Sequence, residues 1–285
     1  MTTTAHREEF PDAAALGVRP AGMTWQPPRF DSTEFFARRT RNCVVVIVWN
    51  EGDRLRDQLE RMRSHCDQAD VLIADWRSDD GSTAPEALRR AGVRALLTTD
   101  EGGLGTAIRM ALAYALEQGY EGVVTVDGNG KDGVQAIPRF IRELDAGYDL
   151  VQGSRFLRGA EHANTPLDRY VGIRFVVSPL LSIAARYFFT DPTNGFRGLS
   201  RRYLTDPGLQ PIRAEFVRFN LQLYLVYRAR RLGCRIVEIP VRRVYPTGGS
   251  IPTKINDLRT KLLFLWQLVR TVAGTYNPDD HCPEL

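Results

Sequence analysis

The chain has 285 residues, of which 43% are hydrophobic and 25% charged, as in an ordinary globular protein that buries a core. Its formal net charge of +4 comes without a dominant block of Lys or Arg, so the composition does not indicate a nucleic-acid partner. No apolar run reaches the ~18 residues of a membrane span and no signal pattern opens the chain, so we expect a cytoplasmic protein.

Regular hydrophobic patterning begins after residue 41. Residues 1–41 contain scattered prolines and no sustained period, which predicts an N-terminal extension. The continuous apolar run 43–48 is typical of a strand buried on both faces. Further strands are predicted at 71–74, 93–97, 123–126 and 150–151, and helices at 55–62, 84–91, 104–116 and 137–144. This alternation predicts an α/β fold with parallel strands, in which ligands bind beyond the carboxyl ends of the strands.

The second half of the chain adds three predicted elements. An apolar helical stretch covers 171–189 and is interrupted by Pro179, and a closing strand covers 236–241. A C-terminal helix and tail occupy 255–285. The main domain is therefore expected to span 42–254.

Polar residues follow several of the predicted strands directly. Trp49-Asn50-Glu51 follows the first strand, and Asp75 and Asp127 end two others. Any one of these groups could be a solvated turn. Together they predict a ligand site at one edge of the sheet.

The segment Gly103-Leu104-Gly105 follows a predicted strand and opens a helix, as in a dinucleotide-binding fingerprint. However, Ile108 occupies the third glycine position of that fingerprint, where a glycine is needed for close packing of helix and strand. We therefore do not favour a dinucleotide-dependent dehydrogenase.

Six polar motifs, taken in order, resemble those of family 2 glycosyltransferases, and within them the dolichol- or polyprenol-phosphate mannosyl- and glucosyltransferase branch. The motifs are Trp49-Asn50-Glu51, Asp75-x-x-Ser78-x-Asp80-Gly81, Gly103-x-Gly105, Asp127-x-Asn129, Gly153-Ser154-Arg155 and Asp191-x-x-Asn194-Gly195-Phe196-Arg197. The resemblance implies a GT-A fold, in which helices flank a mostly parallel central sheet with a Rossmann-like nucleotide-binding half and an acceptor half.

The resemblance also implies roles for individual residues. Those implied to bind the nucleotide-sugar are Trp49, Asn50, Glu51, Asp75, Asp80, Gly103, Lys131 and Lys254. Those implied to take part in catalysis are Asp127, Asp191, Arg155 and Arg197, the two arginines as partners of a phosphate. Asp127 and Asn129 are implied to hold Mg²⁺ or Mn²⁺ against the diphosphate.

Two departures from the family pattern bear on that metal. Asn129 replaces the second acid of the Asp-x-Asp element, and Lys131 follows two positions later. Lys131 is one of three lysines in a chain that otherwise uses arginine for its cations. The lost charge and the added cation put metal dependence in doubt, and Lys131 could itself neutralise diphosphate. The alternative for Lys131 is a solvated loop residue.

The implied reaction is transfer with inversion from a UDP- or GDP-linked sugar to an acceptor. A polyprenyl phosphate would need no general base, and 171–189 would then contact the inner face of a membrane or simply pack as a core helix. A hydroxyl acceptor, in a surface polysaccharide or a specialised metabolite, would need a base, for which Asp191 is the candidate. Asp191 could instead orient the Asn194-Gly195 turn. A third alternative is a catalytically degenerate binding protein of the same fold.

Overall fold

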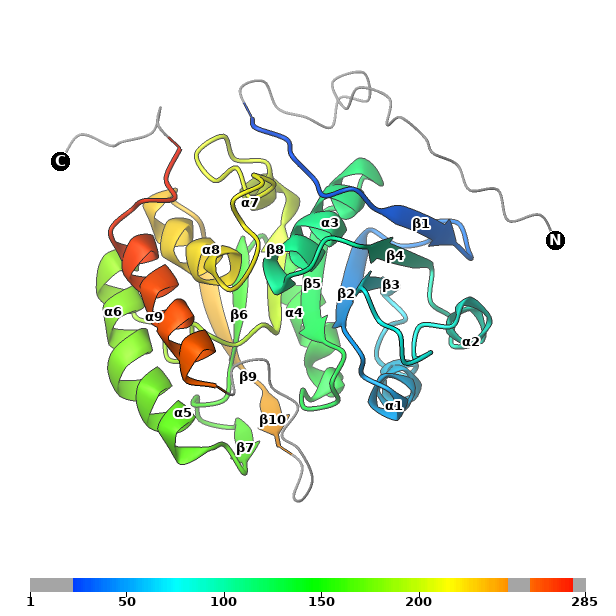
Figure 1. Cartoon of the computed structure of the whole chain (residues 1–285), viewed down its shortest axis with the longest axis horizontal. Coiled ribbons are helices and arrows are strands. Elements are labelled where there is room, and N and C mark those ends of the chain that lie inside the picture. Colours follow the sequence, from blue (N-terminus) through cyan, green and yellow to red (C-terminus); the bar gives the residue numbers. More distant parts are fainter. Residues whose placement is uncertain (1–22, 246–256, 279–285) are drawn as a thin grey trace.

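The computed structural model describes residues 23–245 and 257–278 and is built around one eight-stranded sheet (Figure 1). The sheet order is β1-β4-β3-β2-β5-β8-β6-β9. β1 is antiparallel to β4, and β8 lies antiparallel between β5 and β6, whereas the other neighbours are parallel. The strands are β1 (Asp31–Glu34), β2 (Asn42–Val48), β3 (Ala69–Trp76), β4 (Ala95–Thr99), β5 (Gly122–Asp127), β6 (Leu150–Ser154), β8 (Arg197–Ser200) and β9 (Ile236–Pro240).

A second, two-stranded parallel sheet pairs β7 (Glu161–Ala163) with β10 (Arg242–Val244). The α-helices are α1 (Asp53–Met62), α2 (Pro85–Arg90), α3 (Leu104–Glu117), α4 (Ile137–Asp145), α5 (Leu167–Val171), α6 (Ser178–Ala185), α7 (Arg201–Leu204), α8 (Asn220–Arg231) and α9 (Leu258–Val272). A short 3₁₀ helix, η2 (Val134–Ala136), and a π-helix, η3 (Gly172–Val177), complete the set.

The sheet separates two hydrophobic cores. All seven residues of β2 are buried, and their side chains alternate between the two faces because successive residues of a strand point in opposite directions. Cys43, Val45 and Ile47 join the core under α3, α6 and α8, and Val44 and Val46 join the core under α1 and α4. The predicted α/β fold with a mostly parallel, helix-flanked sheet is confirmed.

Two expectations about elements are corrected. Residues 31–34 were assigned to an extension, but β1 pairs with β4 and therefore belongs to the sheet. Its sequence is too short and polar to show a strand period, so only the pairing reveals it. The stretch 171–189 remains helical through Pro179, because the π-helix η3 precedes α6 and a wider turn accommodates the missing N–H. The helix ends at Arg186, which adopts a left-handed conformation with φ of 57°.

Candidate active site

The candidate site lies at the edge of the sheet where the parallel strands end. Asp75 lies near the end of β3, and Asp127 ends β5. Arg197 reaches the same edge because β8 runs in the opposite direction and begins there, opposite Thr125. The topology thus brings together groups that the sequence separates by more than a hundred residues.

The loops after β2 and β3 hold each other through Asn50. Asn50 has a φ of 52°, its side-chain amide donates to Asp79, and its Oδ1 accepts from the Asp79 N–H, both at 2.9 Å. Beside it the rings of Trp49 and Trp76 lie 4.8 Å apart, and Trp49 is 40% exposed. Trp76 was missed by the sequence analysis. It forms, with Trp49, an aromatic surface at the mouth of the site.

Asp75 and Asp80 accept hydrogen bonds from residues of the same two loops. Asp75 is buried, and its two oxygens accept hydrogen bonds from Ser78 at 2.5 Å and from Thr83 at 2.9 Å. Asp80 accepts from the Gly52 N–H at 2.8 Å. Burial opposes its ionisation, but hydrogen bonds from Ser82 and Gly52 lower the pKa of Asp80 below its ordinary value. Both acids therefore fix the loop backbone.

Glu51 is also buried, and its Oε2 lies 3.5 Å from Nη2 of Arg54. It lies directly before α1, the first helix on this face of the sheet.

Asp127 contacts an arginine that the sequence analysis did not select. Nη2 of Arg243 lies 3.1 Å from Oδ2 of Asp127, and Nη1 of Arg243 lies 2.6 Å and 2.8 Å from the two oxygens of the buried Asp132. Burial alone would lower the pKa of Arg243, but the negative charges of Asp132 and Asp127 raise it well above its ordinary value. The sequence around Arg243 carries no signal for this contact, because both acids lie more than a hundred positions earlier in the chain.

Lys131 and Tyr245 contact each other near Arg243 and Asp127. Nζ of Lys131 is 5.1 Å from the centre of the Tyr245 ring, and both side chains are buried. Burial and the charge of Arg243 lower the pKa of Lys131 to about 8. The expectation that Lys131 lies at the site agrees with this position, and it is not a solvated loop residue.

Tyr245 is surrounded by cations. Nη1 of Arg169 donates to its hydroxyl at 3.1 Å. Burial opposes ionisation, but the positive charges of Arg243, Arg155, Arg169 and Lys131 lower the pKa of Tyr245 to about 7. Neither Tyr245 nor Arg169 was selected from the sequence, because their role depends on segments that meet only in the fold.

Asp191 is the partner of Arg155 and does not lie open to the site as a base. Its side chain is completely buried, and its Oδ2 accepts from Nε of Arg155 at 2.7 Å. Oδ1 accepts from the Thr193 hydroxyl at 3.2 Å. The expected catalytic role of Asp191 is therefore corrected to one of positioning Arg155, because an acid held in a buried ion pair cannot readily take a proton.

Arg197 is likewise a scaffold residue. It is buried and donates to the backbone carbonyls of Gln222 at 2.8 Å, Asn194 at 2.8 Å and Pro192 at 3.3 Å. Burial lowers the pKa of Arg197 to about 10. Its terminal nitrogens bind the 192–194 turn and α8, so these donors already have partners in the chain itself.

Gly103 allows the start of α3 to approach the backbone of Val217 closely. A Cβ at Gly103 would lie 2.2 Å from the carbonyl oxygen of Val217, and the N–H groups of Gly105 and Thr106 both donate to that oxygen. The start of α3 thus binds a neighbouring loop. The expected contact of Gly103 with the nucleotide-sugar stays a prediction. Lys254, the remaining expected ligand residue, lies outside the described residues.

The residues at Asp127 do not fit a divalent ion well. Mg²⁺ and Mn²⁺ prefer several oxygen ligands, mainly carboxylates. Here the amide nitrogen of Asn129 faces Oδ2 of Asp127 at 3.4 Å, and Oδ1 of Asn129 accepts from the Lys131 N–H at 3.3 Å. Within residues 23–245 and 257–278, no three His, Cys, Asp or Glu residues form a group that could hold a metal ion.

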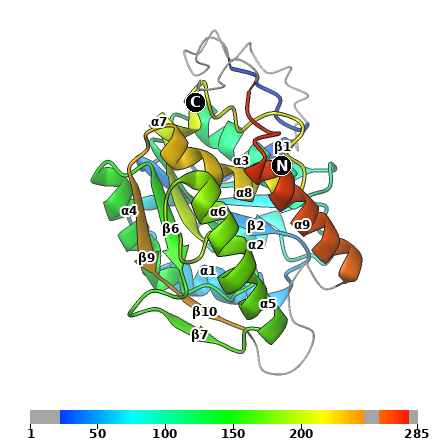
Figure 2. The same cartoon turned by 90° about the vertical axis from the view of Figure 1, so that its left-hand side faces the viewer.

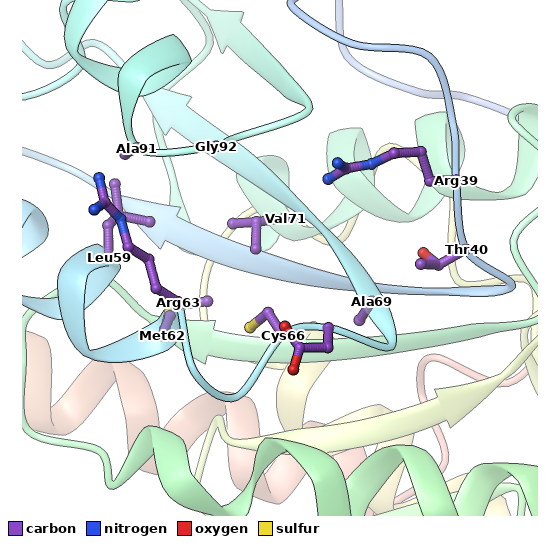
Figure 3. Close-up of a pocket in the computed structure, with 11 residues that line it drawn as sticks. Arg39, Thr40, Leu59, Met62, Arg63, Cys66, Ala69, Val71, Ala91 and Gly92 are labelled. Carbon is purple, nitrogen blue, oxygen red and sulfur yellow. The ribbon is translucent and has the colours of Figure 1, made fainter.

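A cavity of about 410 Å³ lies elsewhere, at the opposite end of β3 (Figure 3). Its lining includes Arg39, Arg63, Val71 and Cys66. Burial and the neighbouring Asp67 raise the pKa of the Cys66 thiol to about 12, so no reactive thiolate is present.

Comparison with known proteins agrees with this geometry. The model of the family described as glycosyl transferase family 2 matches residues 43–206, more than half of the chain. An undecaprenyl-phosphate mannosyltransferase of Micrococcus luteus is 30% identical over 245 residues, which cover 82% of this chain and 99% of that protein. A polyprenol monophosphomannose synthase of Mycolicibacterium smegmatis is 29% identical and covers 70% of this chain and 76% of that protein.

Solved structures show the same fold. Glucosyl-3-phosphoglycerate synthase of Mycobacterium tuberculosis, in complex with Mn²⁺, UDP and glucosyl-3-phosphoglycerate, superimposes with a TM-score of 0.58 at 18% identity. The match covers 83% of this chain and 79% of that chain.

Proposed function

The chain belongs to glycosyl transferase family 2, and from this we propose that it transfers a sugar from a nucleoside diphosphate sugar to a polyprenyl phosphate, with inversion at the anomeric carbon. The observation that carries the acceptor assignment is the convergence of four cations, Lys131, Arg155, Arg169 and Arg243, around Tyr245. Relatives named for undecaprenyl and polyprenol phosphate agree with it.

Buried hydrogen-bond donors support an anionic ligand at this cluster. Among the described residues, Nη1 of Arg155, Nδ2 of Asn194 and Nε of Arg243 are buried and have no hydrogen-bond partner. Buried donors in folded proteins nearly always have an acceptor. Phosphate oxygens would supply one, and arginine offers the planar fork that matches them.

The proposed reaction is a single displacement. A phosphate oxygen of the acceptor attacks the anomeric carbon while the bond from that carbon to the diphosphate breaks, and the diphosphate leaves with the electron pair. A phosphate monoester is already ionised at neutral pH, so no side chain has to remove a proton. This agrees with the buried, ion-paired state of Asp191, whereas a hydroxyl acceptor would require an open base.

The donor is proposed to bind on the other side of Asp127. The exposed ring of Trp49, backed by Trp76, offers a surface on which a base can stack. Asn50, Asp75 and Asp80 hold the two loops that carry these rings. UDP and GDP are both compatible with such a surface.

A lipid acceptor also explains an exposed apolar face. Side chains of α5, η3 and α6 form one row that is more than 40% exposed: Leu167, Val171, Phe175, Val176, Leu180 and Ile183. α9, which lies beside α6 in Figure 2, exposes a second row: Leu258, Leu262, Leu265, Trp266 and Val269. We refer to the two rows together as the apolar face. The basic residues Arg174, Arg186 and Arg259 accompany it, and Arg169 connects it to the cation cluster, which suits an anionic membrane surface.

The test is transfer of labelled sugar from UDP- and GDP-sugars into an organic-extractable product. Wild-type protein should form this product with a polyprenyl phosphate and not with the corresponding polyprenol. Arg169→Gln should lower the rate at least about tenfold, the cost of roughly one charged hydrogen bond, because one arm of the phosphate site is lost. Arg139→Gln, which removes an equal charge on α4 outside both the cluster and the apolar face, should retain activity. Transfer to polyprenol or to free sugars at equal rate would contradict the proposal.

A further inference from the structure

Arg243 lies beside Asp127, the acid that the family resemblance implies would hold a divalent ion. Its guanidinium bridges two acids, with Nη2 3.1 Å from Asp127 and Nη1 within 2.8 Å of both oxygens of Asp132. Its side chain is only 8% exposed, whereas that of Asp127 is 24% exposed and still opens to the site. The Arg243 guanidinium is therefore a buried, permanent partner of the more exposed Asp127 carboxylate.

Two acids and two cations lie together at this point. Asp127 and Asp132 carry two negative charges, Lys131 and Arg243 carry two positive charges, and Asn129 is neutral. With two acids and no resident cation, a bound diphosphate would face strong repulsion unless a divalent ion joined them. With the two resident cations, this repulsion is offset by the chain itself.

We propose that the Arg243 guanidinium, together with Lys131, takes the place of a divalent cation beside Asp127, so that this chain binds a nucleoside diphosphate without Mg²⁺ or Mn²⁺. A divalent ion at Oδ2 of Asp127 would first have to displace Nη2 of Arg243. Arginine is well suited to the task because it stays charged when buried and donates from several positions at once.

The inference rests on the proposed function in one respect, that a nucleoside diphosphate binds at Asp127. Calorimetric titration of wild-type protein with UDP and with GDP, in EDTA and then in Mg²⁺ or Mn²⁺, tests the inference separately from the proposed function. Binding in EDTA within about threefold of binding with metal supports the inference. Binding that requires metal overturns the inference and leaves the proposed function intact. No binding under either condition counts against the proposed function.

Variants locate the effect. Arg243→Gln should weaken nucleotide binding in EDTA at least about tenfold, because a charged donor is lost, and added Mn²⁺ should restore most of it. Arg242→Gln is the matched control, since Arg242 is next in the chain but pairs with Glu161 in the small sheet at 3.1 Å. The control should bind as wild type does, with and without EDTA.

A second readout needs no nucleotide. Mn²⁺ bound to the protein alone, measured by electron paramagnetic resonance, should be weak in wild type and at least about tenfold tighter in Asn129→Asp/Arg243→Gln. If Arg243→Gln unfolds because Asp132 is left as an unpaired buried charge, Asp132→Asn/Arg243→Gln removes both charges and serves instead. Tight Mn²⁺ binding by wild type, or unchanged EDTA tolerance in the folded variants, would overturn the assignment.

Discussion

At the scale of single residues, Tyr245 is the side chain whose chemistry depends most on its neighbours. Its phenol is buried beside Arg169, Lys131 and Arg243, and its pKa falls to about 7. Tyr224 shows the opposite effect, because burial raises its pKa to about 12 although Arg228 and Arg213 oppose the rise. Position among charges, and not burial, separates the two.

This difference predicts a tyrosine that ionises near neutral pH. The tyrosinate absorbance of wild-type protein should show one step near pH 7, and Tyr245→Phe should lack it. Tyr170→Phe, which removes a phenol from the same region, should retain the step. An identical titration of wild type and Tyr245→Phe would show that the cations do not act on this phenol.

The same ionisation links stability to pH. An unfolded tyrosine has a pKa near 10, so between pH 7 and 10 the unfolded chain holds a proton that the folded chain has lost. The contribution of Tyr245 to the free energy of unfolding is therefore complete above pH 10 and is lost as the pH falls to 7. Urea denaturation should show this loss in wild type, on the order of 1 kcal/mol per pH unit, and not in Tyr245→Phe.

At the scale of elements, the contact of α3 with the 216–218 loop sets the shape of one side of the site. A Cβ at Gly105 would lie 2.7 Å from the Phe216 oxygen and 2.8 Å from the Arg218 oxygen. Both are backbone oxygens, which cannot move away by a side-chain rotation. The glycines of this motif therefore have a packing role, although their pattern resembles a phosphate-binding turn.

Gly105→Ala should accordingly destabilise the fold by about 1–3 kcal/mol, because the loop must move away from α3. Gly172→Ala is the control, since a Cβ there meets nothing within 4 Å and lies in a helix. It should leave the free energy of unfolding unchanged or raise it by up to about 1 kcal/mol. Urea denaturation of both variants measures the difference, and equal stability of the two would contradict the packing role.

At the scale of the whole molecule, the hydrogen bond from Arg169 of α5 to Tyr245 links the apolar face to the buried cation cluster. No helix among residues 23–245 and 257–278 is long and apolar enough to cross a membrane. The apolar face spans two neighbouring helices, and Asp168 at the start of α5 pairs with Lys261 of α9 at 2.6 Å. The two rows are thus held in a fixed relation.

Vesicles containing anionic lipid should bind the protein through this face. The emission of Trp266, which is 54% exposed, should shift to shorter wavelength on binding. Ile183→Ser should weaken binding about tenfold or more, because a buried isoleucine contributes about 1.5–3 kcal/mol. Phe36→Ser, which changes an exposed ring at β1, should bind as wild type does. Equal binding by both variants, or none by wild type at low salt, would show that the face serves another purpose.

The sequence by itself determined the α/β fold and the place of Asp127 at the edge of the sheet. Both depend on local information, since buried strands such as β2 are continuous apolar runs and ligand groups follow strand ends. It also singled out Lys131, which the fold buries at the site.

Only the tertiary structure decided which charges meet. Arg243 contacts Asp127, which lies 116 positions earlier in the chain, and Arg155 pairs with Asp191, which lies 36 positions later. β1 belongs to the sheet only because it pairs with β4. None of these contacts leaves a periodic trace, because each depends on two distant segments reaching the same place. The role expected for Asp191 changed for this reason, since a residue's chemistry depends on the partner that the fold brings to it.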